Sequence, residues 1–211
     1  MSGKKVAVFN LKGGVGKSRA AINMALSYPW MGLITNDVNT DLEDYLEPDS
    51  FIRVEGGEQF PLMGTDDCCV YDLGGYIDQR AIEVLKSCDW VVIPTFYDLN
   101  DFKVTARSIR EVEAYNQNII VVLNRSEKGQ SELFMDTFGG MGHPLLRIRK
   151  SEAIRCDMLN ERKSVHLLAS EGGLRGYHYS PVAEDFSRLF ERLGLPAVDL
   201  GEEEACPKKT T

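Results

Sequence analysis

The stretch 6–18, VAVFNLKGGVGKS, joins an apolar run to a glycine-rich turn that ends in Gly-Lys-Ser. Three glycines permit backbone N–H groups to turn inward around an anion, because no Cβ obstructs them: Gly13, Gly14 and Gly16. Lys17 is placed to reach the β- and γ-phosphate oxygens, and Ser18 offers a hydroxyl to Mg²⁺. An amphipathic stretch follows at once, and the N-terminal dipole of a helix there adds to the site. The sequence therefore predicts a strand, a phosphate-binding loop and a helix.

The rest of the chain alternates short apolar runs with amphipathic stretches, which is the pattern of βαβ units. Strands are predicted at Lys5–Phe9, Gly32–Thr35, Cys68–Tyr71, Trp90–Pro94, Ile119–Leu123 and Leu145–Ile148. Helices are predicted at Lys17–Leu26, Ile77–Lys86, Asp101–Tyr115, Ser151–Asn160 and Pro181–Leu193, and flexible loops at Gly139–Gly142 and Ser170–Gly176. We expect an α/β fold of three layers, a doubly wound, mostly parallel sheet with helices on both faces. One domain is expected over residues 1–200, followed by a polar tail at 201–211.

The composition and the charge exclude some classes of protein. The 211 residues are 43% hydrophobic and 27% charged, which is enough to bury a core and excludes disorder for most of the chain. The net charge of −8 argues against constitutive nucleic-acid binding. The charge is uneven, because residues 36–83 hold thirteen acidic and two basic side chains, whereas residues 147–163 hold six basic and three acidic ones.

Targeting and redox signals are lacking. The N-terminal residues contain no apolar run of a signal peptide, and no stretch approaches 18 apolar residues. Five cysteines, an odd number without Cys-x-x-Cys spacing, indicate reduced thiols rather than disulfides or a zinc or iron–sulfur site. We expect a cytoplasmic protein, with or without nucleoid association, and no membrane partner.

The segment Lys12-Gly13-Gly14-Val15-Gly16-Lys17-Ser18 resembles the deviant phosphate loop of the ParA/MinD family of P-loop ATPases. The general loop pattern places a glycine six residues before its lysine, and Leu11 stands there instead. The resemblance implies that Lys12 is a signature lysine, which reaches across a nucleotide-sandwich dimer to the phosphates of the partner. A solvated loop lysine is the alternative.

Two further segments carry the resemblance, which extends to about residue 193. The run GLITND at 32–37 is similar to the second strand of the family, which usually ends in Asp-x-Asp; Asp37 matches the second aspartate and Thr35 replaces the first. This implies that Asp37 positions water and senses nucleotide, with a turn or capping aspartate as the alternative. The run CCVYDLGG at 68–75 has the form of a Walker B segment, in which Asp72 holds Mg²⁺ and Gly75 approaches the γ-phosphate.

Segments in the second half of the chain also resemble the family. The run NIIVVLNR at 118–125 resembles the strand of the family that ends in an adenine-binding asparagine, here Asn124. An asparagine that only forms the turn after the strand is a strong alternative. In the family, residues near 147–163 contact the DNA backbone without sequence preference once ATP has formed the dimer. The corresponding cations are Arg147, Arg149, Lys150, Arg155, Arg162 and Lys163, and an ordinary solvated helix with ion pairs is an equal alternative.

The resemblance therefore implies a ParA-like ATPase that uses ATP and Mg²⁺, forms a homodimer on binding ATP, and partitions or positions DNA or another cargo with a stimulating adaptor protein. The expected catalytic residues are Lys12, Lys17 and Asp37. The expected nucleotide-binding residues are Lys12, Gly13, Gly14, Val15, Gly16, Lys17, Ser18, Arg19, Gly75 and Asn124, and the metal ligands are Ser18, Asp37 and Asp72. A nucleotide-dependent scaffold, or a conjugation- or stability-associated protein with vestigial hydrolysis, is the alternative that Thr35 keeps open.

Overall fold

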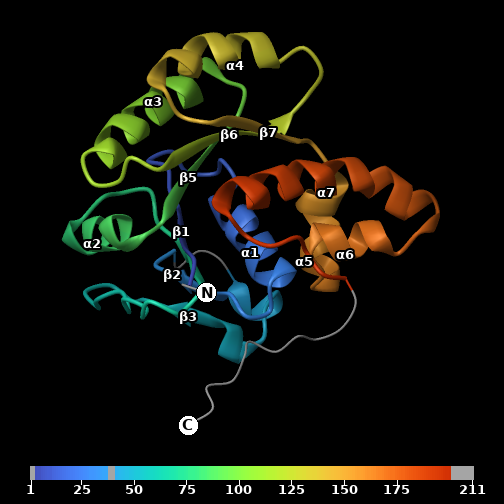
Figure 1. Cartoon of the computed structure of the whole chain (residues 1–211), viewed down its shortest axis with the longest axis horizontal. Helices are drawn as coiled ribbons and strands as arrows, with labels where there is room; N and C mark the ends of the chain where they lie inside the picture. The colour runs from blue at the N-terminus through green and yellow to red at the C-terminus, as the bar shows by residue number, and fades with distance from the viewer. Residues whose placement is uncertain (1–2, 38–40, 201–211) are drawn as a thin grey trace.

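The computed structural model describes residues 3–37 and 41–200, and the predicted tail at 201–211 lies outside this part of the chain. Its sheet has seven strands in the order β3-β2-β4-β1-β5-β6-β7, and every pair is parallel (Figure 1). The strands are β1 Lys5–Val8, β2 Gly32–Thr35, β3 Phe51–Arg53, β4 Cys69–Asp72, β5 Trp90–Thr95, β6 Ile119–Ser126 and β7 Leu145–Arg149. The α-helices are α1 Lys17–Ser27, α2 Gln79–Ser87, α3 Leu99–Glu113, α4 Ser131–Phe138, α5 Met158–Glu161, α6 Val165–Ser170 and α7 Gly173–Leu193.

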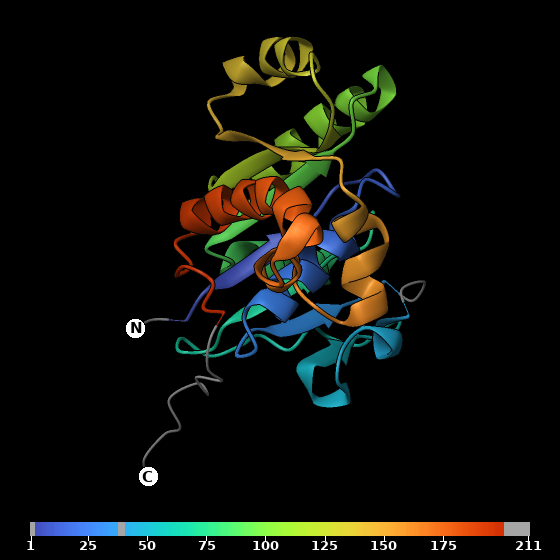
Figure 2. The same cartoon turned by 90° about the vertical axis from the view of Figure 1, so that its right-hand side faces the viewer.

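Helices cover both faces of the sheet. Figure 1 shows α2, α3 and α4 on one side and α1, α5, α6 and α7 on the other, and Figure 2 brings the second group to the front. The two faces hold separate hydrophobic cores, and successive residues of β1 and the residue after it alternate between them: Val6 and Val8 belong to one core, and Ala7 and Phe9 to the other. Because both faces are buried, the strands read as continuous apolar runs. The three-layer doubly wound fold expected from the sequence is confirmed.

The strand order determines where a ligand can bind. β1 lies beside β4, and the connections that leave these two strands run to opposite halves of the sheet: α1 leads from β1 to β2, whereas α2 leads from β4 to β5. Ligands of open parallel sheets bind outside the carboxyl ends of the strands at such a switch point. Asp72 pairs in register with Val8 on one side and Thr35 on the other. The glycine-rich loop after β1 therefore meets the carboxyl ends of β2 and β4.

The C-terminal third differs from the prediction. The expected flexible loop at Ser170–Gly176 and the expected helix start at Pro181 are wrong, because α7 begins at Gly173 and Pro181 lies inside it. A Cβ on Gly176 would lie 2.6 Å from the carbonyl oxygen of Ala169 in α6. This glycine therefore permits close helix packing rather than flexibility. None of the described helices is long and apolar enough to span a membrane.

Three smaller differences concern short elements. The predicted helix at Ser151–Asn160 is a π-helical turn, Ala153–Asp157, that continues into α5. The predicted loop at Gly139–Gly142 is largely a 3₁₀ turn, Gly139–Met141. β3, α4 and α6 were not expected from the sequence, since each is short and its apolar residues show no extended period.

Candidate functional site

The phosphate loop connects β1 to α1 and depends on glycine geometry. Gly14 has φ +78° and Gly16 φ +92°, in the left-handed region that residues with a Cβ avoid. A Cβ on Gly16 would also lie 2.2 Å from Nδ2 of Asn124. α1 begins directly after Gly16, so its first backbone N–H groups face the loop. The loop can therefore surround an anion at a helix N-terminus.

A buried asparagine anchors the start of the loop, and sequence reasoning missed it. Asn10 donates from Nδ2 to the carbonyl oxygen of Pro94 (2.8 Å) and to Oγ1 of Thr105 (2.9 Å). Its Oδ1 accepts from the backbone N–H of Lys12 (2.9 Å) and from Oγ of Ser108 (2.9 Å). These bonds tie the loop to β5 and α3. The sequence feature that could have pointed to Asn10 is an amide side chain directly after an apolar run that forms a strand.

Lys17 extends into the loop from the first turn of α1. The residue is 7% exposed, and its Nζ donates to the carbonyl oxygen of Lys12 at 3.2 Å. Burial lowers the pKa of Lys17, while the nearby carboxylates of Asp72 and Asp37 act in the opposite direction. A buried ammonium group at the loop is suited to binding phosphate oxygens.

Asp72 ends β4 beside this lysine. It is 1% exposed, and burial raises its pKa to about 6, against the opposing effects of a hydrogen bond from Ser18 and of the Lys17 charge. Its Oδ1 has no hydrogen-bond partner among the described residues. An unpartnered buried carboxylate oxygen next to a serine hydroxyl fits Mg²⁺, which prefers hard oxygen ligands. Ser18 and Asp72 are thus brought together as the sequence predicted.

Thr35 supports both aspartates at the end of β2. Its Oγ1 donates to the carbonyl oxygen of Asp72 at 3.1 Å and lies 3.4 Å from Oδ2 of the same residue. Oγ1 also accepts from the backbone N–H of Asp37 at 3.0 Å, and Arg53 donates to the carbonyl oxygen of Asp37 at 3.0 Å. The threonine therefore links Asp72 to the predicted catalytic aspartate, Asp37.

The loop after β4 packs against the loop after β1. A Cβ on Gly75 would lie 2.9 Å from the carbonyl oxygen of Leu11. Asn36, which sequence reasoning missed, accepts from the N–H of Gly74 at 2.7 Å and donates to the hydroxyl of Tyr76 at 3.2 Å. The ends of β2 and β4 are therefore linked to each other through the side chain of Asn36.

A cavity of about 660 Å³ opens between these loops. Most of the predicted site lines it, including Gly13, Gly14, Gly16, Lys17, Ser18, Arg19, Asp37 and Gly75. The lining also includes Tyr45, Tyr76 and Arg80, none of which was predicted. Lys12, Val15, Asp72 and Asn124 do not line this cavity.

The predicted signature lysine points toward α3. Lys12 Nζ lies 3.5 Å from Oδ1 of Asp101, in the first turn of that helix. The lysine side chain is 43% exposed, whereas that of Asp101 is 11% exposed. Lys12 is therefore a half-exposed residue that pairs with an acidic side chain of α3.

A smaller cavity on the other side of Gly16 includes Arg19, Phe96, Asn124 and Arg125. Asn124 donates from Nδ2 to the carbonyl oxygen of Val15 at 3.0 Å, and its Oδ1 accepts from the N–H of Arg125 at 2.9 Å. One amide hydrogen and one lone pair remain for a further contact. Asn124 thus braces the phosphate loop whether or not it also contacts a base.

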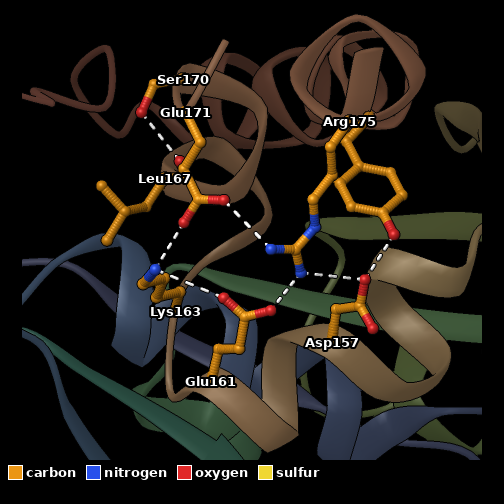
Figure 3. A network of polar contacts seen from close by, with 8 residues as sticks. Asp157, Glu161, Lys163, Leu167, Ser170, Glu171 and Arg175 are labelled. Carbon is orange, nitrogen blue, oxygen red and sulfur yellow. Dashed lines mark hydrogen bonds and ion pairs between the residues drawn. The ribbon is translucent and has the colours of Figure 1, made fainter. Parts of the chain in front are cut away.

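The six predicted DNA-contact residues are engaged with carboxylates for the most part. Those pairs are Asp185 with Arg149, Glu127 with Lys150, Glu152 with Arg155, Glu47 with Arg162, and Glu161 and Glu171 with Lys163. Figure 3 shows Lys163 in a network that Arg175 extends to Asp157. The guanidinium of Arg147 contacts the hydroxyl of Ser131 instead.

The sequence matches no protein-family model and no curated protein. Solved structures do resemble this one. The ATP complex of a Cyanothece McdA variant has a TM-score of 0.65 at 16% identity, with 93% of this chain and 98% of that chain covered. MinD of Aquifex aeolicus has a TM-score of 0.58 at 16% sequence identity, with 89% of this chain and 97% of that chain covered. A ParA family ATPase of Chlorobium tepidum has a TM-score of 0.59 at 19% identity, with 87% of this chain and 98% of that chain covered. The chain therefore has the fold of the ParA/MinD ATPases.

Proposed function

We propose that this chain is a ParA-like ATPase that binds ATP with Mg²⁺ and switches between a monomer and a nucleotide-sandwich dimer to position DNA or another cargo. One observation carries the proposal: a buried lysine, a serine hydroxyl and an unpartnered buried carboxylate oxygen converge on a glycine loop at a helix N-terminus. The similar solved folds include proteins described as a ParA family ATPase and a putative plasmid partition protein bound to AMPPNP.

Each residue has a role in this proposal. The loop amides and Lys17 bind the β- and γ-phosphates, and Ser18 and Asp72 hold the metal, with Asp37 close by. Mg²⁺ supplies charge neutralisation for the transferring phosphoryl group. Asp37 orients the attacking water, and Lys12 leaves Asp101 to reach the phosphates of the partner protomer. Each nucleotide thus contacts Lys17 of the protomer that binds it and Lys12 of the other protomer.

Light scattering of the purified chain with and without ATP and Mg²⁺ tests the switch. We expect the mass to double with ATP, and Lys12→Ala to prevent this while the chain stays folded, as a cooperative melting curve would show. Lys103→Ala, at an exposed position on α3, is the matched control. A mass that stays monomeric at saturating ATP, with binding confirmed by calorimetry, would refute the sandwich dimer. Loss of ATP binding in Lys17→Ala tests the phosphate site separately.

A nucleotide-dependent scaffold with little turnover is the second candidate, and Thr35 favours it because one carboxylate of the Asp-x-Asp pattern is missing. Phosphate release measured on the same ATP-bound dimer separates the two. Turnover that Asp37→Ala slows, with binding retained, supports the ATPase. A dimer that forms with ATP but releases no phosphate supports the scaffold.

A further inference from the structure

A second cavity, of about 580 Å³, lies along β7, the edge strand of the sheet, and shares no lining residue with the nucleotide cavity. β7 lies between α4 and α7 in Figure 1, and both helices contribute to the lining. The apolar part of the lining comes from Phe134 and Met135 of α4 and from Leu145 and Leu146 of β7. We call this cavity the edge groove.

The backbone of β7 has groups that face the edge groove and have no hydrogen-bond partner among the described residues. Pro144 accepts from Val121, and Lys150 donates to Ser126, so even-numbered residues in this segment bond toward β6. In a parallel ladder the intervening residues direct their N–H and C=O groups to the opposite side. Leu145 and Arg147 therefore face outward along the edge.

The outward edge closes at one end. The backbone N–H of Arg149 donates to Oδ2 of Asp185 on α7 at 3.0 Å, which blocks that position. An edge strand with open N–H and C=O groups is a template for pairing with another extended chain. The open length from Leu145 to Arg147 suits a short segment.

The lining of the edge groove has an excess of positive charge, whereas the whole chain has a net negative charge. Four cations line it, Lys128, Arg147, Arg149 and Arg188, against two acids, Glu127 and Asp185, although the whole chain has a net charge of −8. Both acids are already neutralised, since Asp185 pairs with Arg149 and Arg188, and Glu127 pairs with Lys150. Among the described residues, no carboxylate pairs with Lys128 or Arg147.

We propose that the edge groove binds an extended, acidic segment of a partner protein, which adds to β7 as a further parallel or antiparallel strand. A peptide backbone supplies both donors and acceptors to Leu145 and Arg147, whereas nucleic-acid phosphates can only accept. A second copy of this chain would bring Lys128 and Arg147 of one groove close to the same cations of the other, which like-charge repulsion opposes. An acidic strand satisfies the backbone, the cations Lys128 and Arg147, and the apolar lining together.

Fluorescence anisotropy with a labelled nine-residue peptide of alternating glutamate and valine tests charge and shape. We expect saturable binding without nucleotide, weakened at least tenfold by Arg147→Glu. Arg107→Glu, a charge reversal at an exposed position on α3, is the matched control and is expected to bind like the wild type. Equal binding by both variants, or no binding at millimolar chain, overturns the proposal. Both variants alter exposed side chains, so melting curves confirm that they fold.

The same peptide with alternate backbone amides N-methylated tests strand addition, because it keeps the charge but loses half of its donors. We expect its binding to be lost and the amide of Arg147 to exchange more slowly with solvent only in the presence of the unmethylated peptide. Equal binding of both peptides refutes strand addition. Labelled duplex DNA that binds in an Arg147-dependent way, while the peptide does not, assigns the surface to nucleic acid and overturns the proposal.

Discussion

Replacing Asp101 with asparagine removes the carboxylate that holds Lys12 at 3.5 Å in the free chain. Under the proposed dimer, Lys12 must leave this partner to reach the nucleotide of the other protomer. The ion pair therefore competes with dimerisation. Asp101→Asn is expected to make the ATP-bound dimer tighter, because less energy is needed to release the lysine.

The size of the effect follows from the exposure of the pair. The lysine is 43% and the aspartate 11% exposed, so solvent screens most of the Coulomb attraction. Such a pair contributes about 1 kcal/mol. A two-fold dimer breaks two of them, one in each protomer. The upper bound is about 2 kcal/mol, or about a 30-fold decrease in the dimer dissociation constant.

Light scattering over a dilution series in saturating ATP and Mg²⁺ measures this constant. Glu111→Gln is the control, because it breaks the exposed pair with Arg107 on the same helix without touching the loop. The control should dimerise like the wild type. If Asp101→Asn weakens the dimer, or matches the control, then the pair does not restrain Lys12 and the reasoning fails.

Three other substitutions test separate contacts. Gly16→Ala should lower nucleotide affinity at least tenfold by calorimetry, because its Cβ would lie 2.2 Å from Asn124; Gly129→Ala, with φ +88° and no atom within 4 Å, controls for backbone strain alone. Asn36→Ala should leave ATP affinity intact but speed amide exchange in the loop after β4, whose N–H it binds; unchanged exchange would contradict this. Burial lowers the pKa of His166 from 6.5 to about 4. Between these pH values the unfolded chain binds a proton that the folded chain does not bind, so stability decreases as the pH falls. Urea unfolding should lose about 2 kcal/mol from this residue between pH 7.5 and 5, and His166→Gln should lose correspondingly less; an unchanged pH dependence would rule the histidine out.

Much of the fold could be predicted because its signals are local. The apolar run, the glycine turn and the amphipathic helix follow one another in sequence, and α1 begins at Lys17 as expected. The β2 bounds also match, since Gly32–Thr35 is a short apolar run with clear limits. The order of the strands in the sheet could not be predicted from such signals, because it depends on which runs pair.

The missed site residues depend on contacts between distant segments. Asn10 bonds to Thr105, 95 residues away, and Asn36 bonds to Tyr76, 40 residues away. The ion pairs of residues 147–163 depend on distant contacts in the same way, since the acids that pair with Arg149 and Lys150 lie outside that run. A local count of charges shows how many cations are present but not which of them are neutralised.

Thr35 shows how a departure from a pattern can be compensated. An aspartate at this position would place a second carboxylate against Asp72, whose pKa burial already raises to about 6. The threonine instead donates to Asp72 and accepts from the backbone N–H of Asp37. A neutral hydroxyl therefore supports both residues without adding like charge to a buried site, where such charge is costly. What the exchange removes is a charge rather than a structural support, because the hydroxyl of Thr35 still bonds to Asp72 and to the backbone of Asp37.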